Sequence, residues 1–314
     1  MIFLKSVLSR YLEILGYKNR PKFIDKYLSV PSLLRLKKVG YFCGMDYASK
    51  EIYSFGEYIS RYDHSLTVAL LTYRYTKDKR ATIAALFHDI ATPCFSHVID
   101  YMNKDYEKQE STEEYTEIIL REDKILQAYL KEDHILIEDI IDFKKYSIVD
   151  NDRPRVCADR LDGVLLMGLF WTKTITIDDV FEIINDTQVF MNEEGKEEIG
   201  FSTKEIADLV LKTSETIDQY CHSDEDNYMM DLLSEITKLA IDSSYVTYDD
   251  LYRMDEERLI HILETCHHEK IKELLTIFKT VKKSDVCKTE LNNIKIRDLN
   301  PLLNGKRLKS IKEE

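Results

Sequence analysis

The sequence predicts a mainly α-helical protein with one small β-hairpin. Among its 314 residues there are only 9 glycines and 5 prolines, so residues that make turns or break helices are scarce. Long segments rich in Leu, Ile, Lys and Glu lie between them and are typical of amphipathic helices. Hydrophobic residues make up 44% of the chain, which is enough to bury one large core or two smaller ones.

The first helices are predicted at residues 2–16 and 31–39. Gly16 ends the first, whereas Pro31 starts the second and Gly40 stops it. Charged residues interrupt the apolar ones of the first helix at helical spacing, so we expect an amphipathic helix packed on the body rather than a signal peptide. Because no run of about 18 apolar residues occurs, we expect no membrane-spanning segment.

The next two predicted helices carry candidate functional residues. An apolar rhythm of three and four residues predicts a helix at about 54–75, with His64 near its inner face. A second helix is predicted at about 80–90, and Pro93 prevents its continuation. Further helices are predicted at about 111–131, 135–146 and 155–170.

The remaining sequence predicts a hairpin and then more helices. Two short runs within residues 186–202 flank a polar turn with a glycine, which predicts two antiparallel strands. Helices are predicted to follow at about 203–240 and 248–282. Since there is no internal repeat or linker, the domain boundary is soft. We expect residues 1–185 to form the helical core with the site, and residues 186–314 to pack on that core.

The stretch from Ala84 to Asp100 contains the central candidate functional residues of the chain. Four apolar residues precede the adjacent His88 and Asp89, which predicts that both side chains are buried. Burial of an imidazole and a carboxylate without a partner would cost several kcal/mol. We infer that the partner is a metal ion, because imidazole and carboxylate suit Fe, Mn, Zn or Mg and differ from the thiolates of structural zinc sites.

Two flanking segments complete a set of four ligands. Residues 60–66 (SRYDHSL) contain His64, and residues 156–162 (VCADRLD) contain Asp159. With the central pair, these residues would hold one divalent ion and leave positions for water and substrate. The predicted metal ligands are therefore His64, His88, Asp89 and Asp159. Asp162 follows Asp159 on the same helical face, so its carboxylate could orient the ligands.

These segments resemble the HD-domain metal-dependent phosphohydrolases. The surroundings resemble one branch of that superfamily, the deoxynucleoside triphosphate triphosphohydrolases or dGTPase-like enzymes, which is marked here by Arg61 before His64 and by Ser65-Leu66 after it. Other segments similar to this branch are 31–40 (PSLLRLKKVG), 93–100 (PCFSHVID) and 159–162 (DRLD). Several ordered motifs make the likeness specific. It implies an HD-domain helical bundle around a metal site.

The resemblance also implies roles for residues beyond the ligands. In the resembled enzymes, the second His and Asp after the HD pair act in proton transfer and phosphate contact, which places those roles on His97 and Asp100. The two could form a hydrogen-bonded pair in which Asp100 sets the tautomer and basicity of His97. Arg61 and Arg160 are candidates for phosphate contact, although for Arg160 a surface or structural ion pair is an alternative of nearly the same weight. Asp162 is assigned to the substrate-binding group.

Some positions depart from the family pattern. The family has a further catalytic His downstream of His97, where the nearest alignment places Glu107. A Tyr that packs on the deoxyribose is replaced by Gly163, and an acidic residue that contacts the sugar is replaced by Met167. The metal ligands are therefore retained while the sugar-contacting surface changes. Hydrolysis of a phosphomonoester or phosphodiester competes with triphosphate release from a dNTP as the expected reaction.

Charge and cysteine content narrow the expected partners. The formal net charge of −13, without a long basic tract, argues against duplex nucleic acid and anionic membranes as partners. Six scattered cysteines without a CxxC pair indicate free thiols and a cytoplasmic location. The expected partner is a phosphorylated small-molecule substrate, with a nucleotide as the first candidate. The resemblance further implies that the chain could form a homo-oligomer.

Three functions fit the sequence. The first is a metal-dependent phosphohydrolase acting on a nucleotide or related phosphorylated small molecule, including dNTP cleavage to deoxynucleoside and triphosphate. The second is a nucleotide-binding regulatory HD protein with little or no turnover, which the departures from the family pattern favour. The third is a helical partner-binding protein whose metal stabilises the fold. The cofactor is a divalent ion, and the ligand types do not distinguish Mn, Mg, Fe, Zn and Ni.

Overall fold

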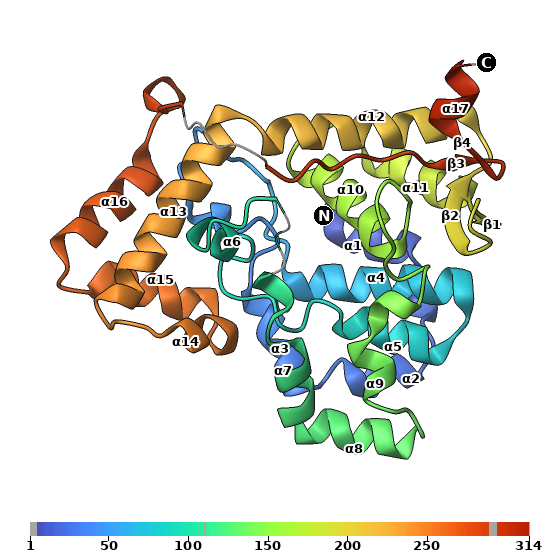
Figure 1. Ribbon diagram of the computed structural model, residues 1–314, viewed down its shortest axis with the longest axis horizontal. Helices are drawn as coiled ribbons and strands as arrows, with labels where there is room; N and C mark the ends of the chain where they lie inside the picture. Colours follow the sequence, from blue (N-terminus) through green and yellow to red (C-terminus); the bar gives the residue numbers. More distant parts are fainter. Residues whose placement is uncertain (1–4, 108, 110, 289–293, 314) are drawn as a thin grey trace.

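The computed structural model describes residues 5–107, 109, 111–288 and 294–313. It is mainly helical with one small sheet, which confirms the predicted fold class (Figure 1). The central helices are α4 (Arg61–Thr76), α5 (Lys79–Phe87), α10 (Ala158–Phe170) and α12 (Lys204–Cys221). Helix α4 packs against both α5 and α10, and α12 packs against α10. These contacts place the predicted ligand segments at the centre of the bundle.

The N-terminal helices are shorter than the sequence pattern predicts. Helix α1 (Val7–Ile14) begins after Ser6, whose hydroxyl accepts a hydrogen bond from the Ser9 N–H group, and it ends before Gly16. The first residues of the predicted helix, 1–4, lie outside the described residues. Short helices α2 (Phe23–Tyr27) and α3 (Pro31–Arg35) follow, and a 3₁₀ turn at 36–38 continues α3.

Local sequence signals start and stop the two central helices. Ser60 caps α4: its hydroxyl accepts a hydrogen bond from the Asp63 N–H group at 3.2 Å, and the Asp63 carboxylate accepts one from the Ser60 N–H group at 2.9 Å. The helix therefore begins later than the predicted range of 54–75. Lys77, in a left-handed conformation, ends α4, and Asp78 caps α5. This tight connection fixes the two helices beside each other.

The prediction of one long helix at 111–131 is wrong, because the structure divides this range into separate elements. The observed elements are a 3₁₀ turn at 111–113, α7 (Thr116–Glu122) and α8 (Lys124–Glu132). Asp123 causes the division, since its carboxylate accepts hydrogen bonds from two N–H groups of α8 and so starts a new helix. The helix predicted at 135–146 is likewise reduced to α9 (Glu138–Ile141) and a 3₁₀ turn at 143–145.

A four-stranded sheet lies at one end of α12 (Figure 1). Strands β1 (Thr187–Met191) and β2 (Glu197–Phe201) pair antiparallel, which confirms the hairpin predicted within residues 186–202. Strand β3 (Leu302–Leu303) pairs parallel to β2, and β4 (Lys306–Arg307) pairs antiparallel to β3. The sequence does not predict these last two strands, because two-residue strands carry no periodic pattern.

The second half of the chain is helical in shorter units than predicted. Its helices are α11 (Ile177–Asp186), α12, α13 (Asp224–Asp242), α14 (Tyr248–Arg253), α15 (Glu256–Thr265), α16 (Glu269–Thr280) and α17 (Leu308–Glu313). Ser223 divides the predicted helix at 203–240 because its hydroxyl caps α13. Helix α13 packs against α6 (Val98–Met102) and α16. Within the described ranges, no helix combines the length and the apolar character that a membrane crossing requires.

An extended segment, residues 294–300, runs beside α12 toward the sheet (Figure 1). The Arg297 N–H group donates to Asp218 Oδ1 of α12 at 2.7 Å. The Asn300 N–H group donates to the carbonyl oxygen of Pro154, in the loop before α10, at 2.8 Å. This segment therefore links α12 to the loop that precedes one of the predicted ligand helices.

Candidate metal centre

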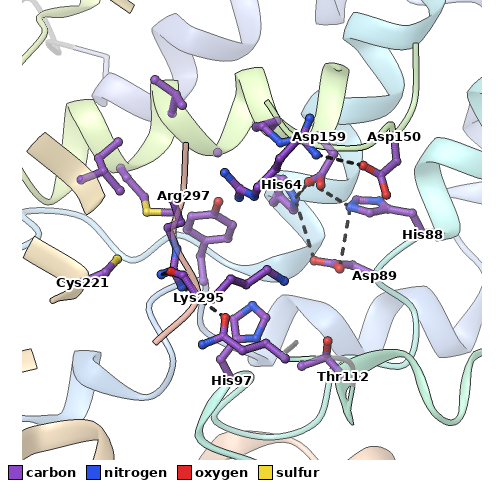
Figure 2. Close-up of a pocket in the computed structure, with 18 of the residues that line it drawn as sticks. His64, His88, Asp89, His97, Thr112, Asp150, Asp159, Cys221, Lys295 and Arg297 are labelled. Atoms are coloured by element: carbon purple, nitrogen blue, oxygen red, sulfur yellow. Dashed lines mark hydrogen bonds and ion pairs between the residues drawn. The ribbon is translucent and has the colours of Figure 1, made fainter. Parts of the chain in front are cut away.

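Four side chains from three helices meet in one place (Figure 2). His64 lies in the first turn of α4, His88 caps the C-terminus of α5 with Asp89 next to it, and Asp159 lies in the first turn of α10. Asp159 Oδ1 lies 2.9 Å from His64 Nε2 and 3.4 Å from His88 Nε2. The Asp89 carboxylate lies 3.9 and 3.7 Å from the same two nitrogens. The structure thus brings all four predicted ligands together.

The hydrogen bonds of the two histidines leave one nitrogen of each facing this centre. His88 Nδ1 donates to the Ala85 carbonyl oxygen at 2.8 Å, and His64 Nδ1 donates to Asp162 Oδ2 at 2.7 Å. His88 Nε2 is buried and has no hydrogen-bond partner among the described residues. Metal-binding histidines commonly donate their other ring N–H group in this way. Ligand atoms of His64, His88 and Asp89 lie within 4.8 Å of one another, so the donor set fits a divalent ion.

The charges of these four side chains and their neighbours favour a positive charge at the centre of the site. Burial lowers the pKa of His64, but hydrogen bonds to Asp159 and Asp162 outweigh this effect and raise the pKa to about 10. Burial raises the pKa of Asp89, but the neighbouring His88 and Arg61 outweigh it and lower the pKa to about 2. The carboxylates therefore stay ionised over the physiological range and attract a cation.

Asp162 lies behind His64, away from the centre of the group. It is fully buried, and its carboxylate accepts hydrogen bonds from His64 Nδ1, from the Thr67 hydroxyl at 2.8 Å and from the Tyr11 hydroxyl. This position does not support the predicted substrate contact of Asp162, because no part of a substrate beside the metal ligands could reach it. The contacts instead suit the orienting role that its helical spacing suggests.

Replacing Asp162 with asparagine is expected to weaken Mn²⁺ binding about 10- to 100-fold, because the amide holds the His64 ring less firmly than the carboxylate does. Calorimetric titration of the metal-free protein with Mn²⁺ measures the change. Tyr11→Phe serves as the matched variant, since it removes one hydrogen bond from the same carboxylate but leaves its charge, and a smaller loss is expected. An Mn²⁺ affinity of the Asp162→Asn protein equal to that of the wild type would contradict the orienting role.

His97 and Asp100 form the hydrogen-bonded pair that their spacing predicts. His97 Nδ1 lies 2.9 Å from Asp100 Oδ2, and the other carboxylate oxygen accepts the Ser111 N–H group at 3.1 Å. Asp100 is fully buried, whereas His97 is partly exposed and lines a cavity. The loop before His97 is fastened by the Phe95 N–H group, which donates to Glu256 Oε1 at 2.9 Å. The role of this pair in proton transfer stays a prediction.

The two predicted phosphate-binding arginines have different partners. Arg61 Nη1 lies 2.9 Å from Asp89 Oδ2, so its guanidinium is next to the metal ligands. Arg160 donates from its two terminal nitrogens to the side chain and the carbonyl oxygen of Asn151, each at 2.7 Å. Both arginines line the cavity. Arg61 therefore lies beside the candidate metal ligands, whereas Arg160 mainly holds the loop before α10, and phosphate contact by either arginine stays a prediction.

The four candidate metal ligands lie in the wall of a cavity of about 880 Å³. Aromatic side chains on this wall include Phe42, Tyr53, Phe55, Tyr101 and Trp171. Glu107 and Met167, two of the departures from the family pattern, also line it. At Gly163, an added side chain would approach the Tyr41 hydroxyl to 3.2 Å, so Tyr41 fills the space that such a side chain would use. Pockets of this size typically hold small-molecule ligands.

The short sequence motifs do not point to the basic residues on one wall of this cavity. Arg153 comes from the loop before α10, and Lys295 and Arg297 come from the extended segment 294–300. The alternation of Lys295 and Arg297 about one apolar residue is typical of an extended backbone that presents both basic side chains on one side. That alternation is the signal in the sequence that could have found them.

Comparison with known proteins agrees with this geometry. Residues 61–164, from the start of α4 into α10, match the model of the HD domain family. This part of the chain is similar to the HD domain. The match supports the predicted resemblance to the HD superfamily, and together with the donor group it confirms the predicted divalent metal cofactor.

Two curated relatives are similar to the chain in sequence. The uncharacterized protein YdhJ of Bacillus subtilis is 25% identical over 231 residues, which are 69% of this chain and 65% of YdhJ. The metal-dependent phosphohydrolase cns2 of Cordyceps militaris is 24% identical over 132 residues, 42% of this chain and 37% of cns2. The matched part therefore spans less than two thirds of either relative.

A solved structure shares the fold of the chain. The crystal structure of a hypothetical protein from Aquifex aeolicus superposes with a TM-score of 0.56 at 19% sequence identity. The match covers 88% of this chain and 71% of that chain. At this identity the likeness shows a shared fold, which reaches well beyond the HD segment itself.

Proposed function

We propose that this HD protein is a metal-dependent phosphohydrolase acting on a nucleotide or a related phosphorylated small molecule. The observation that carries the proposal is the group of two histidines and two aspartates on the wall of a cavity of about 880 Å³. A divalent ion held by these residues supplies a Lewis acid for a phosphoryl oxygen and makes a bound water more acidic.

The residues around the metal ligands would bind the phosphoryl group and move a proton. Arg61 is fixed by its ion pair with Asp89 at 2.9 Å, and its guanidinium brings positive charge to phosphoryl oxygens at the metal. Asp100 accepts the Nδ1 proton of His97 at 2.9 Å, which leaves His97 Nε2 to exchange a proton with the reacting groups. Together they supply the charge and the proton transfer that phosphoester hydrolysis needs.

The aromatic wall of the cavity supports a nucleotide as the substrate. Phe42 and Phe55 stack with their ring centroids 4.0 Å apart, and both line the cavity with Trp171. Aromatic faces of this kind bind planar rings by stacking. Cleavage of a dNTP to a deoxynucleoside and triphosphate is the finer form of the proposal. In that case Tyr41, above Gly163, would be the residue that contacts the sugar.

One observation favours a second function, a nucleotide-binding regulatory protein with little turnover. Glu107 lines the cavity where the resembled enzymes carry a further catalytic histidine. Unlike a protonated histidine, a carboxyl group there cannot be a positively charged proton donor, and it would repel phosphate when ionised. This change leaves metal and nucleotide binding possible while weakening the proton transfer.

Phosphorus NMR with Mn²⁺ separates the two functions. The purified protein is incubated with dNTPs, NTPs, nucleoside monophosphates and a phosphodiester, with the His88→Ala protein as the control. Metal-dependent phosphate, pyrophosphate or triphosphate release by the wild type alone is expected. Nucleotide binding without any product would replace the phosphohydrolase with the regulatory protein.

A further inference from the structure

The cavity collects basic side chains from two distant parts of an acidic chain. The net charge of the protein is −13, yet Arg153, Lys295 and Arg297 all line the cavity that holds the metal ligands. Figure 2 shows Lys295 close to His97 and Arg297 on the same side of the site, opposite His88. A cationic wall facing the metal ligands is unexpected in a protein of this composition unless the wall binds anions.

The backbone of the segment 294–300 is fastened so that it presents these two side chains. The Lys295 N–H group donates to the Tyr106 carbonyl oxygen at 2.9 Å, and the Arg297 N–H group donates to Asp218 Oδ1 at 2.7 Å. The intervening Ile296 is 67% exposed. Alternation along an extended backbone therefore turns Ile296 to solvent and turns Lys295 and Arg297 to the cavity.

Arg153 joins the same wall through contacts between the two segments. Its Nη1 donates to the Asp298 carbonyl oxygen at 3.3 Å, and the neighbouring Pro154 accepts the Asn300 N–H group at 2.8 Å. These backbone contacts hold the loop before α10 against the extended segment. The cationic wall is thus a built feature of the fold.

The two arginines of this wall are not paired with carboxylates of the protein. Within the described ranges, neither Arg153 nor Arg297 forms an ion pair, and Arg297 donates instead to the Gln109 side chain at 3.3 Å and the Lys295 carbonyl oxygen at 3.2 Å. Arg153 as a whole residue is exposed, but loss of water around its guanidinium, together with the nearby Arg160 and Arg297, lowers its pKa to about 10. Like charges held together in this way are stabilised by a bound anion.

We propose that Arg153, Lys295 and Arg297 form a subsite for an oligophosphate, which takes a phosphate of the substrate other than the one at the metal ligands. The inference rests on the proposed function for the identity of the reacting phosphate. It narrows the substrate class to compounds with two or more linked phosphates. A phosphomonoester would leave this wall without its anion.

Calorimetric titration with inorganic triphosphate tests the subsite directly. The host is the His88→Ala protein in EDTA, so that binding does not depend on a metal ion. The substitutions Lys295→Gln and Arg297→Gln are each expected to weaken triphosphate binding about tenfold or more, because each removes one hydrogen bond between charged groups. Lys306→Gln is the matched control, because Lys306 is an exposed lysine of β4, outside the cavity, and no change is expected.

The outcomes separate this proposal from the proposed function. Unchanged affinity in both cavity variants, or an equal loss in Lys306→Gln, would overturn the subsite. If Arg297→Gln does not fold, as judged by thermal unfolding, the Lys295→Gln result alone decides. Triphosphate binding that depends on the two residues, without hydrolysis of any phosphate compound, supports the subsite and refutes the phosphohydrolase. Hydrolysis of a phosphate compound, with triphosphate binding unchanged in the two variants, would support the phosphohydrolase and overturn the subsite.

Discussion

Replacing His88 with alanine is expected to abolish stoichiometric metal binding and to lower the phosphohydrolase rate by more than about 100-fold. Outer residues that only orient a metal ligand already cost about 10- to 100-fold when replaced, and His88 would be a ligand itself. Its Nε2 is buried without a hydrogen-bond partner in the described structure, so the metal is its natural partner. Elemental analysis after loading with Mn²⁺ and gel filtration, together with phosphate release, measures both effects.

The control for this variant is His261→Ala, which removes an exposed histidine of α15 far along the chain from the HD segment. It is expected to retain the metal and the rate of the wild type. Thermal unfolding in EDTA checks that the His88→Ala protein is folded. A folded His88→Ala protein with a full complement of metal would show that the ion binds elsewhere.

Replacing Glu256 with glutamine is expected to stabilise the protein at alkaline pH by an amount on the order of a few kcal/mol. Glu256 is fully buried, and burial is the main cause that raises its pKa to about 8. Its Oε1 accepts the Phe95 N–H group at 2.9 Å, whereas Oε2 and Asp46 Oδ2 are buried without hydrogen-bond partners among the described atoms. Glutamine keeps the first contact and carries no charge at any pH.

The sign of the pH dependence follows from the raised pKa of Glu256. Between the ordinary carboxyl pKa of 4.5 and the folded value of about 8, the folded protein holds a proton that the unfolded chain has lost. The free energy of unfolding therefore falls as pH rises through this window. Urea unfolding across it should show a smaller fall for Glu256→Gln than for the wild type. Parallel curves for the two proteins would contradict the assignment.

That the four candidate metal ligands meet in one place could be predicted from the sequence because short motifs carry them. The adjacent His88 and Asp89 follow a buried helix, and His64 and Asp159 each lie in the first turn of a helix that starts nearby. Once the helices pack as a bundle, these positions must face one another. The place of Asp162 behind His64 depends on the packing of Tyr11 against the bundle, which no local pattern specifies.

The length of the helices and the cationic wall were harder to predict for different reasons. The caps at Asp123 and Ser223 divide predicted helices whose apolar rhythm continues across the break, because a side-chain oxygen satisfies the first N–H groups of the next helix. The cationic wall depends on contacts between the loop at 153–154 and the segment 294–300, which are far apart in the chain. Local periodicity carries no information about such pairing.

The position of the segment 294–300 also has a consequence during protein synthesis. The helices α4, α5 and α10 leave the ribosome well before this segment, so the nascent chain can assemble the four ligands while one side of the cavity is still missing. Closing that side requires a contact between residues of large sequence separation, which forms late because the loop must first be ordered. An incomplete chain would therefore form the candidate metal site before the proposed oligophosphate subsite.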